Sequence, residues 1–296
     1  MEEVFNQYPE LQLFLTRFVE LLKTSENIRS IILFGGISLG DFSKKYSDID
    51  LVVTLEKEPT VKEIEEIQEI FFELRAQNEV LTKLLYVYFI PIEMIENPDK
   101  MYQSKQGLII REKGKKAFNQ YPLSVTDTFT IFKYGKILFG KNDKQKFPNL
   151  SSEVIFAKFK EDLPSIESAT FKYPFQYSEV QCHEIAVNWI LYFPRLLYSI
   201  TEKDVISKHN GAFWFSDKYS NDLGRFVVNV AKCRRSSISL DKIGNLVEKS
   251  VQLLLFSLEQ VLQIMGKKSL NLADLVETNG EIKNFKLVFK KLDELF

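Results

Sequence analysis

The sequence predicts an α+β protein, with a mixed-sheet α/β domain followed by an all-helical domain. Apolar residues in the first half alternate between strand and helix periodicity, whereas those in the second half follow helix periodicity alone. A length of 296 residues accommodates two domains of about 150 residues each. We therefore expect the α/β domain at residues 1–145 and the helical domain at residues 146–296.

Two amphipathic helices are predicted in the first domain, at residues 8–23 and 60–75, because apolar residues recur there every three or four positions. Short β-branched runs bounded by turn residues predict the strands. These runs are residues 30–34, 49–55 and about 84–90, with short edge strands at 108–112 and 136–140.

A polar segment, residues 141–150, contains a proline and has no periodicity, so we predict an interdomain linker there. Beyond it, apolar residues keep helical spacing and alternating β-branched runs are absent. The predicted helices are residues 153–162, 179–200, 204–215, 220–234, 241–266 and 281–295.

The composition and charge of the chain argue against several classes of function. Lys plus Arg is 39 and Asp plus Glu is 40, so the near-neutral chain is not expected to bind polymeric nucleic acid. The longest apolar run, residues 84–92, is about half of the ~20 residues that a membrane span needs. The acidic start differs from a signal peptide. With Cys182 and Cys233 lacking metal-ligand spacing, we expect a cytoplasmic protein with reduced thiols and no membrane partner.

The segment from residue 33 to 55 carries the chemistry. A predicted strand ends in Gly35-Gly36, and Asp48 and Asp50 open the next strand. Glycines let the backbone turn sharply and approach a ligand, so that N–H groups face a phosphate. Carboxylates two residues apart on a strand project from one face. Such a pair of hard oxygen ligands suits Mg²⁺, which bridges nucleotide phosphates.

The order of these features resembles the nucleotidyltransferase superfamily of the DNA polymerase β type. In that family a strand and Gly-(Gly/Ser) precede Asp-x-Asp, and here eleven residues separate Gly36 from Asp48. The resemblance implies that Asp48 and Asp50 hold one or two Mg²⁺ ions, and that Gly35 and Gly36 bind the triphosphate. Many members have Ser where this chain has Gly36, and Ser38 is the candidate to supply that hydroxyl.

A second segment resembles the aminoglycoside adenylyltransferases of the streptomycin/spectinomycin type. Arg195, Tyr198, Lys208 and Trp214 follow the spacing of that family's Arg-x-x-Tyr-Ser…Lys…Trp stretch. The resemblance implies that Lys208, from the helical nucleotide-closing domain, reaches the nucleotide phosphates and offsets their charge. It makes Asp48, Asp50 and Lys208 the expected catalytic residues.

One departure from that family concerns the general base. A Glu on the strand after Asp-x-Asp has this role in the family, but residues 83–89 contain no carboxylate. We expect Leu85 at the position of that Glu. Among the acidic residues nearby in the sequence, Glu93 is the least unfavourable candidate to replace it as the general base. Loss of a general base typically slows a reaction by about 10²–10⁴-fold.

The leading hypothesis is a Mg²⁺-dependent enzyme that transfers a nucleoside monophosphate from ATP or another NTP to a hydroxyl of a small, aminoglycoside-like molecule. The missing carboxylate favours an alternative, a regulatory module that binds nucleotide without catalysis. A third reading, an enzyme that nucleotidylates a protein side chain, uses the same aspartates and stays open.

Overall fold

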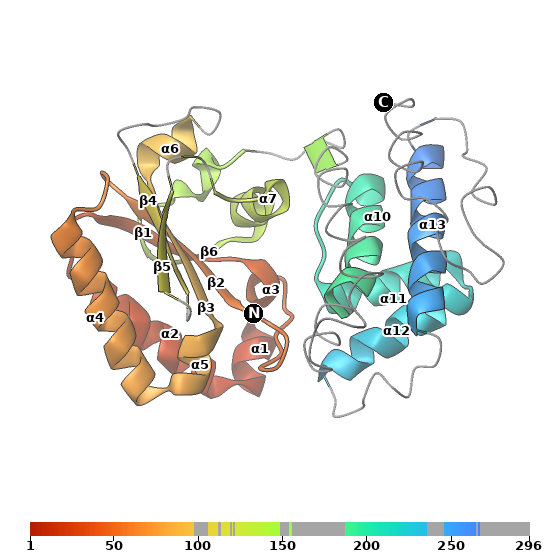
Figure 1. The fold of residues 1–296 in the computed structure, drawn as a ribbon, viewed down its shortest axis with the longest axis horizontal. Helices are drawn as coiled ribbons and strands as arrows, with labels where there is room; N and C mark the ends of the chain where they lie inside the picture. The colour runs from red at the N-terminus through yellow and green to blue at the C-terminus, as the bar shows by residue number, and fades with distance from the viewer. Residues whose placement is uncertain are drawn as a thin grey trace. The chain divides into compact units, whose positions relative to one another are not determined.

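The computed structural model divides into two compact units, Met1–Leu150 and Ser151–Phe296 (Figure 1). The described residues are 1–97, 106–111, 114–118, 120, 122–148, 154–155, 187–235, 246–264 and 266. Among the described helices, none combines the length and the apolarity that a membrane span requires.

The first unit is built on a six-stranded mixed sheet with the strand order β5-β4-β3-β2-β1-β6. The strands are β1 (Ile28–Leu33), β2 (Ile49–Leu55), β3 (Leu85–Pro91), β4 (Gly107–Arg111), β5 (Gly114–Phe118) and β6 (Lys136–Gly140). Strands β2 and β3 are parallel, whereas the other neighbouring pairs are antiparallel. The sheet and its helices confirm the predicted fold class of this unit.

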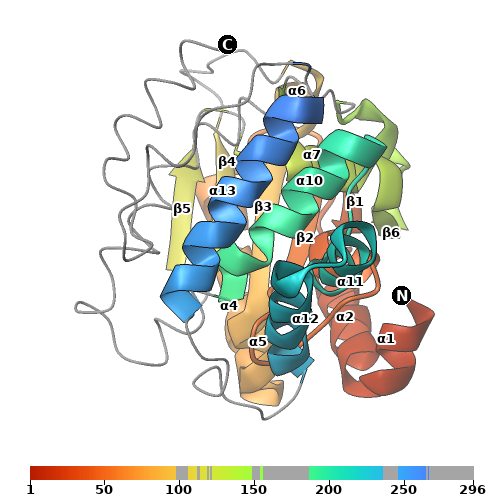
Figure 2. The ribbon, with the colours of Figure 1, turned by 90° about the vertical axis from the view of Figure 1, so that its right-hand side faces the viewer.

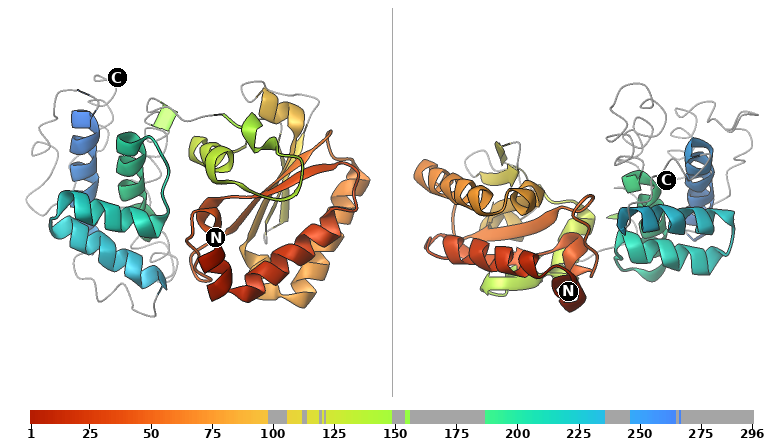
Figure 3. Two further views of the ribbon diagram at one scale, coloured as in Figure 1. Left: turned by 180° about the vertical axis from the view of Figure 1, so that it is seen from behind. Right: turned by 90° about the horizontal axis from the view of Figure 1, so that it is seen from below.

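Helices cover both faces of this sheet. They are α1 (Glu2–Gln7), α2 (Pro9–Leu22), α3 (Gly35–Ser38), α4 (Val61–Gln77), α5 (Glu79–Leu84), α6 (Ile92–Glu96) and α7 (Val125–Tyr134). Helices α2 and α4 lie along one face, and α6 and α7 lie on the other (Figures 1 and 3). The start of α4 is fixed by a capping box between Thr60 and Glu63.

Each face of the sheet carries its own apolar core, because successive side chains of a strand point to opposite sides. Leu51, Val53 and Val87 pack on the side of α2 and α4, which we call the α4 face. Val52 and Tyr88 pack on the side of α6 and α7, which we call the α7 face. The phase of β2 therefore places Asp50 on the α7 face.

The second unit is helical wherever regular structure is described. Its long helices are α10 (Tyr192–Glu202), α11 (Lys208–Tyr219), α12 (Asp222–Arg235) and α13 (Leu246–Ile264). Helix α11 contacts α10 and α12, and α13 packs beside α10 (Figure 2). Cys233 is buried in α12, and this burial raises the pKa of its thiol, as expected for a packed cysteine. Most of 153–162, all of 281–295 and Cys182 lie outside the described residues.

Several elements differ from the sequence predictions, among them β4, β5 and α7. The strand expected at an edge, residues 108–112, is the interior strand β4, because Gly114–Phe118 adds β5 beyond it. The sequence signal of β5 is weak, since its residues are GKKAF and mostly exposed. Helix α7, Val125–Tyr134, was not predicted either, although its N-cap Ser124 is a standard helix-start signal.

The predicted linker at residues 141–150 is also partly wrong, because its first half is anchored to the sheet. Residues Asp143–Lys146 form a 3₁₀ helix, η1, and Asp143 is 1% exposed. Its carboxylate accepts hydrogen bonds from Arg29 Nε at 2.7 Å and from the Thr54 hydroxyl at 2.8 Å. A buried charge is tolerated when it is paired in this way, so the chain leaves β6 along a fixed path.

We predict that Asp143→Ala lowers the free energy of unfolding by about 2–4 kcal/mol, because it leaves Arg29 and Thr54 without their shared acceptor. The control is Glu66→Ala, which removes an exposed pair with Lys62 and should change stability by less than about 0.5 kcal/mol. Urea unfolding of both variants measures the difference. Equal effects would contradict a structural role for the Asp143 cluster.

Candidate functional site

The site begins where β1 ends, at Gly35. This residue has a φ of +68°, a conformation that glycine adopts without a steric penalty. A Cβ atom at Gly35 would lie 2.1 Å from Oδ2 of Asp50, so the backbone touches the carboxylate directly. The amide of Phe34 also donates to the Asp50 carbonyl at 3.0 Å, which fixes the two strands together at this point. The predicted glycine turn and the second aspartate are therefore neighbours.

The short helix α3 places the other predicted phosphate-binding residues. A Cβ on Gly36 would lie 2.8 Å from the carbonyl oxygen of Asp41, so this glycine is also sterically required. The Ser38 hydroxyl donates to the Gly35 carbonyl at 2.9 Å, and Ser38 is buried. Its proton is thus used within the turn, and Ser38 supports the Gly35 backbone.

Asp48 lies just before β2 and is more exposed than Asp50. Its Oδ1 is 3.8 Å from Nη2 of Arg111, the last residue of β4. The Arg111 guanidinium lies over the ring of Tyr86, with its carbon 4.0 Å from the ring centroid. Tyr86 is the register partner of Asp50 on the parallel strand β3. These contacts place Asp48, Asp50, Tyr86 and Arg111 together on the α7 face.

The structure contradicts the expectation that Leu85 occupies the position of the general-base Glu. Leu85 pairs with Ile49 and is buried in the core of the α4 face, so it points away from the aspartates. Tyr86, one residue later, is the side chain that lies next to Asp50. The expected strand is correct but its phase is wrong by one residue, which moves a side chain to the other face of a sheet.

Tyr88 follows Tyr86 on the same face, with ring centroids 4.8 Å apart. Burial raises the pKa of the Tyr88 phenol well above its ordinary value, and the hydrogen bond with Tyr86 and the charges of Asp127 and Asp50 raise it further. Tyr88 therefore stays protonated at neutral pH and is unsuited to accept a proton from a substrate.

Asp127 is a carboxylate near this face that was not predicted from the sequence. It lies in the first turn of α7 and accepts a hydrogen bond from the Ser124 hydroxyl at 2.6 Å. Its charge is one of the causes of the raised Tyr88 pKa, so Asp127 lies near that phenol. The sequence signal was the Ser-x-x-Asp pattern of a helix N-terminus, which by itself indicates only a cap.

Two carboxylates in this setting fit a magnesium ion that arrives with a nucleotide. Among the described residues, no group of three or more His, Cys, Asp or Glu side chains could hold a metal alone. Mg²⁺ is commonly held by one or two carboxylates together with substrate phosphates and water. The exposed Asp48 and the half-buried Asp50 match this requirement.

In the helical unit, Lys208 is the first residue of α11. Ser207 caps this helix, and the Lys208 ammonium donates to Oδ1 of Asn188 at 2.7 Å. Arg195 fixes the preceding loop, because its Nε donates to the Ile206 carbonyl at 2.9 Å. A lysine at this end of a helix adds its charge to the positive end of the helix dipole, an arrangement that favours an anion.

The other two residues of the Arg-x-x-Tyr-Ser…Lys…Trp stretch are packing residues within the helical unit. Tyr198 of α10 and Trp214 of α11 meet edge to face, with ring centroids 5.3 Å apart. Lys218 covers the Trp214 ring from one turn later, with its ammonium 4.9 Å from the centroid. This stretch therefore joins α10 to α11 and so sets the position of Lys208.

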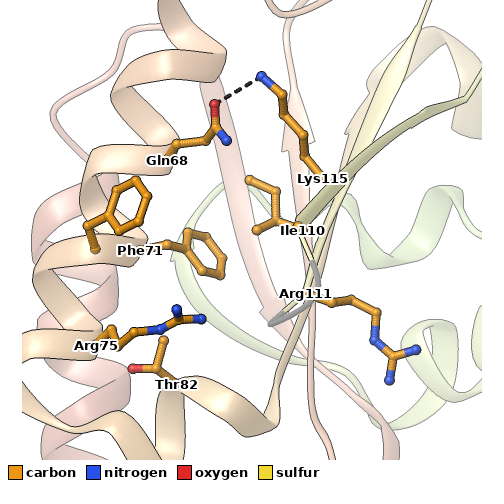
Figure 4. Close-up of a pocket in the computed structure, with 9 residues that line it drawn as sticks. Gln68, Phe71, Arg75, Thr82, Ile110, Arg111 and Lys115 are labelled. Carbon is orange, nitrogen blue, oxygen red and sulfur yellow. Dashed lines mark hydrogen bonds between the residues drawn. The ribbon is translucent and has the colours of Figure 1, made fainter.

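A pocket of about 110 Å³ lies on the α4 face, away from the aspartates. Phe71 of α4 and Ile110 of β4 line it, and Lys115 donates to Gln68 at its rim (Figure 4). Arg111 contributes to the lining, but its guanidinium points away from Gln68 and Phe71 (Figure 4). The pocket and the aspartates are therefore on opposite faces of the sheet.

Comparisons with known proteins agree with this fold. Residues 14–111 match the family model of the nucleotidyltransferase domain, a range that runs from α2 to Arg111. A solved structure, spectinomycin adenyltransferase AAD(9) from Enterococcus faecialis with ATP and spectinomycin, has a similar fold with a TM-score of 0.60 and 12% sequence identity. The match covers 82% of this chain and 97% of that chain. A search of the curated proteins finds no match.

These comparisons confirm the predicted resemblance and the α+β fold class, and they support transfer of a nucleoside monophosphate as the general reaction. Residues 14–111 are thus similar to the nucleotidyltransferase domain, and the chain resembles spectinomycin adenyltransferase AAD(9) in fold.

Proposed function

We propose that this protein is a Mg²⁺-dependent adenylyltransferase that transfers AMP from ATP to a hydroxyl of a small, aminoglycoside-like molecule. The observation that carries the proposal is the contact between the Gly35 backbone and the Asp50 carboxylate, with Asp48 on the same face. A glycine turn in direct contact with a metal-binding carboxylate brings backbone N–H groups and the metal to the same phosphates.

The roles of the residues follow from their positions. Asp48 and Asp50 would hold Mg²⁺, which supplies charge neutralisation at the phosphates. The Gly35 and Gly36 backbone would bind the triphosphate, and Ser38 would hold that backbone in place. We assign Lys208 to the phosphates as well, because both its charge and the start of α11 favour an anion.

In the proposed reaction, the acceptor oxygen attacks the α-phosphorus and the bond to the bridging oxygen of pyrophosphate breaks. The hydroxyl proton leaves to a base or to water. Positioning and charge neutralisation supply most of the acceleration in such a transfer.

One observation favours the alternative, a nucleotide-binding module without catalysis. Tyr86 is the side chain beside Asp50 on β3, where the related enzymes are expected to have a general base. Tyr88, the next residue on this face, stays protonated because burial raises its pKa. With tyrosines at these positions, β3 has no side chain suited to accept the proton of the acceptor hydroxyl. The residues proposed to bind the nucleotide and the metal are unaffected.

We predict that the double substitution Asp48→Asn and Asp50→Asn abolishes Mg²⁺-dependent binding of a non-hydrolysable ATP analogue, because neutral amides bind Mg²⁺ far more weakly than carboxylates. Isothermal titration calorimetry measures the affinity with and without Mg²⁺. The control, Glu65→Gln with Glu69→Gln, removes two exposed charges from α4 and should bind normally. Unchanged affinity in the aspartate variant would refute the proposed site.

We predict that Gly35→Ala loses at least about tenfold in affinity for Mg²⁺ and the ATP analogue, because its Cβ would displace Asp50. Gly40→Ala is the matched control: Gly40 has a similar φ of +78°, but no atom lies within 4 Å of its added Cβ. Both variants should lose about 1–2 kcal/mol of stability from the left-handed backbone, and only Gly35→Ala should lose binding. Equal loss of binding in both would mean that backbone strain alone is responsible.

We predict that pyrophosphate is released when the protein is incubated with ATP, Mg²⁺ and an aminoglycoside panel, at a rate about 10²–10⁴-fold below that of a transfer with a general base. A coupled phosphate assay measures release with and without each acceptor. If ATP binds but no acceptor yields pyrophosphate, the non-catalytic module is the better description. Release with a protein acceptor only would favour nucleotidylation of a side chain.

A further inference from the structure

Arg111 is a charged residue of the site that has no role in the proposed function. It ends β4, and its guanidinium lies between Tyr86 and Asp48, with the carbon 4.0 Å from the ring centroid and Nη2 3.8 Å from Oδ1. Tyr86 in turn is the register partner of Asp50. A permanent cation therefore lies near Asp48, one of the two carboxylates expected to bind the metal.

The contacts of Arg111 orient its side chain but hold it weakly. The side chains of Arg111 and Asp48 are 52% and 55% exposed, and exposed ion pairs contribute little to stability. Within the described part of the chain, no hydrogen bond engages the guanidinium, which has five N–H donors. The contact with the Tyr86 ring holds the guanidinium over that ring, and the side chain stays half exposed.

The charges around Arg111 indicate which ligand its guanidinium would bind. Among the described residues, no third carboxylate joins Asp48 and Asp50 in a group that could hold a metal. Once Asp48 coordinates Mg²⁺, it no longer neutralises Arg111. A guanidinium in that position is best neutralised by the phosphates of the same nucleotide, which it can bind with two parallel hydrogen bonds.

We propose that Arg111 is a phosphate-binding residue that pairs with Asp48 before the nucleotide binds and with the triphosphate once it is bound. This inference rests on the proposed function, since its ligand is the same nucleotide. Arg111 then supplies, from the protein, a positive charge that a second metal ion would otherwise bring to the site. Tyr86 positions Arg111 by stacking.

The test compares Arg111→Gln with the wild type in two titrations. For Mg²⁺ and a non-hydrolysable ATP analogue, we expect affinity to fall by about tenfold, because a charged hydrogen bond to phosphate is lost. For Mg²⁺ alone, we expect affinity to rise several-fold, because Asp48 loses a competing cation. These opposite changes distinguish a ligand role from simple damage to the site.

Three further variants sharpen the result. Arg75→Gln removes the same charge from the exposed surface of α4 and should change neither affinity. Tyr86→Leu should weaken nucleotide binding less than Arg111→Gln, because the charge remains and only the stacking is lost. Tyr86→Phe keeps the ring and should weaken nucleotide binding less than Tyr86→Leu does.

Two results would overturn the role of Arg111 while leaving the proposed function intact. One is nucleotide affinity in Arg111→Gln within twofold of the wild type. The other is weaker binding of both Mg²⁺ alone and the nucleotide, which would mean that Arg111 only maintains the shape of the aspartate pair. Absence of nucleotide binding by the wild-type protein would overturn the proposed function and Arg111's role together.

Discussion

The contact between the Gly35 backbone and the Asp50 carboxylate is the constraint on which the site depends. It requires a residue without a side chain, a positive φ and a tight junction between the end of β1 and the start of β2. The register of β2 with β3 then sets Tyr86 beside Asp50, and β4 brings Arg111 against Tyr86. The steric fit at Gly35 and the strand registers together determine which side chains surround the carboxylates.

The sequence was sufficient for the parts of this arrangement that local chemistry encodes. Strands β1 and β2, the glycine turn and the Asp48/Asp50 pair follow from short patterns, because the residue types in them favour one local structure strongly. The position next to Asp50 did not follow, because an error of one residue in strand phase exchanges Leu85 for Tyr86. Arg111 was missed because its proximity to Asp48 depends on β4 pairing with β3.

Tertiary contacts also account for the elements that were predicted wrongly. Residues 141–150 have the polarity of a linker, but the charge of Asp143 is matched by Arg29, more than a hundred residues earlier in the chain, and this pairing orders the segment. Polarity predicts exposure only when no partner is present inside the fold. Strand β5 is similar, because its lysine-rich sequence gains a place in the sheet through pairing with β4.

Several residues assigned to the nucleotide depart from the usual stability rules. Gly35 adopts a left-handed backbone, and Lys208 adds positive charge to the positive end of α11. The ion pair of Asp48 with Arg111 is long and exposed. The capping box of α4, by contrast, follows the rules, because an acidic residue lies at the helix start. Such local conflicts are expected where binding is selected over stability, because the ligand then supplies the missing charge.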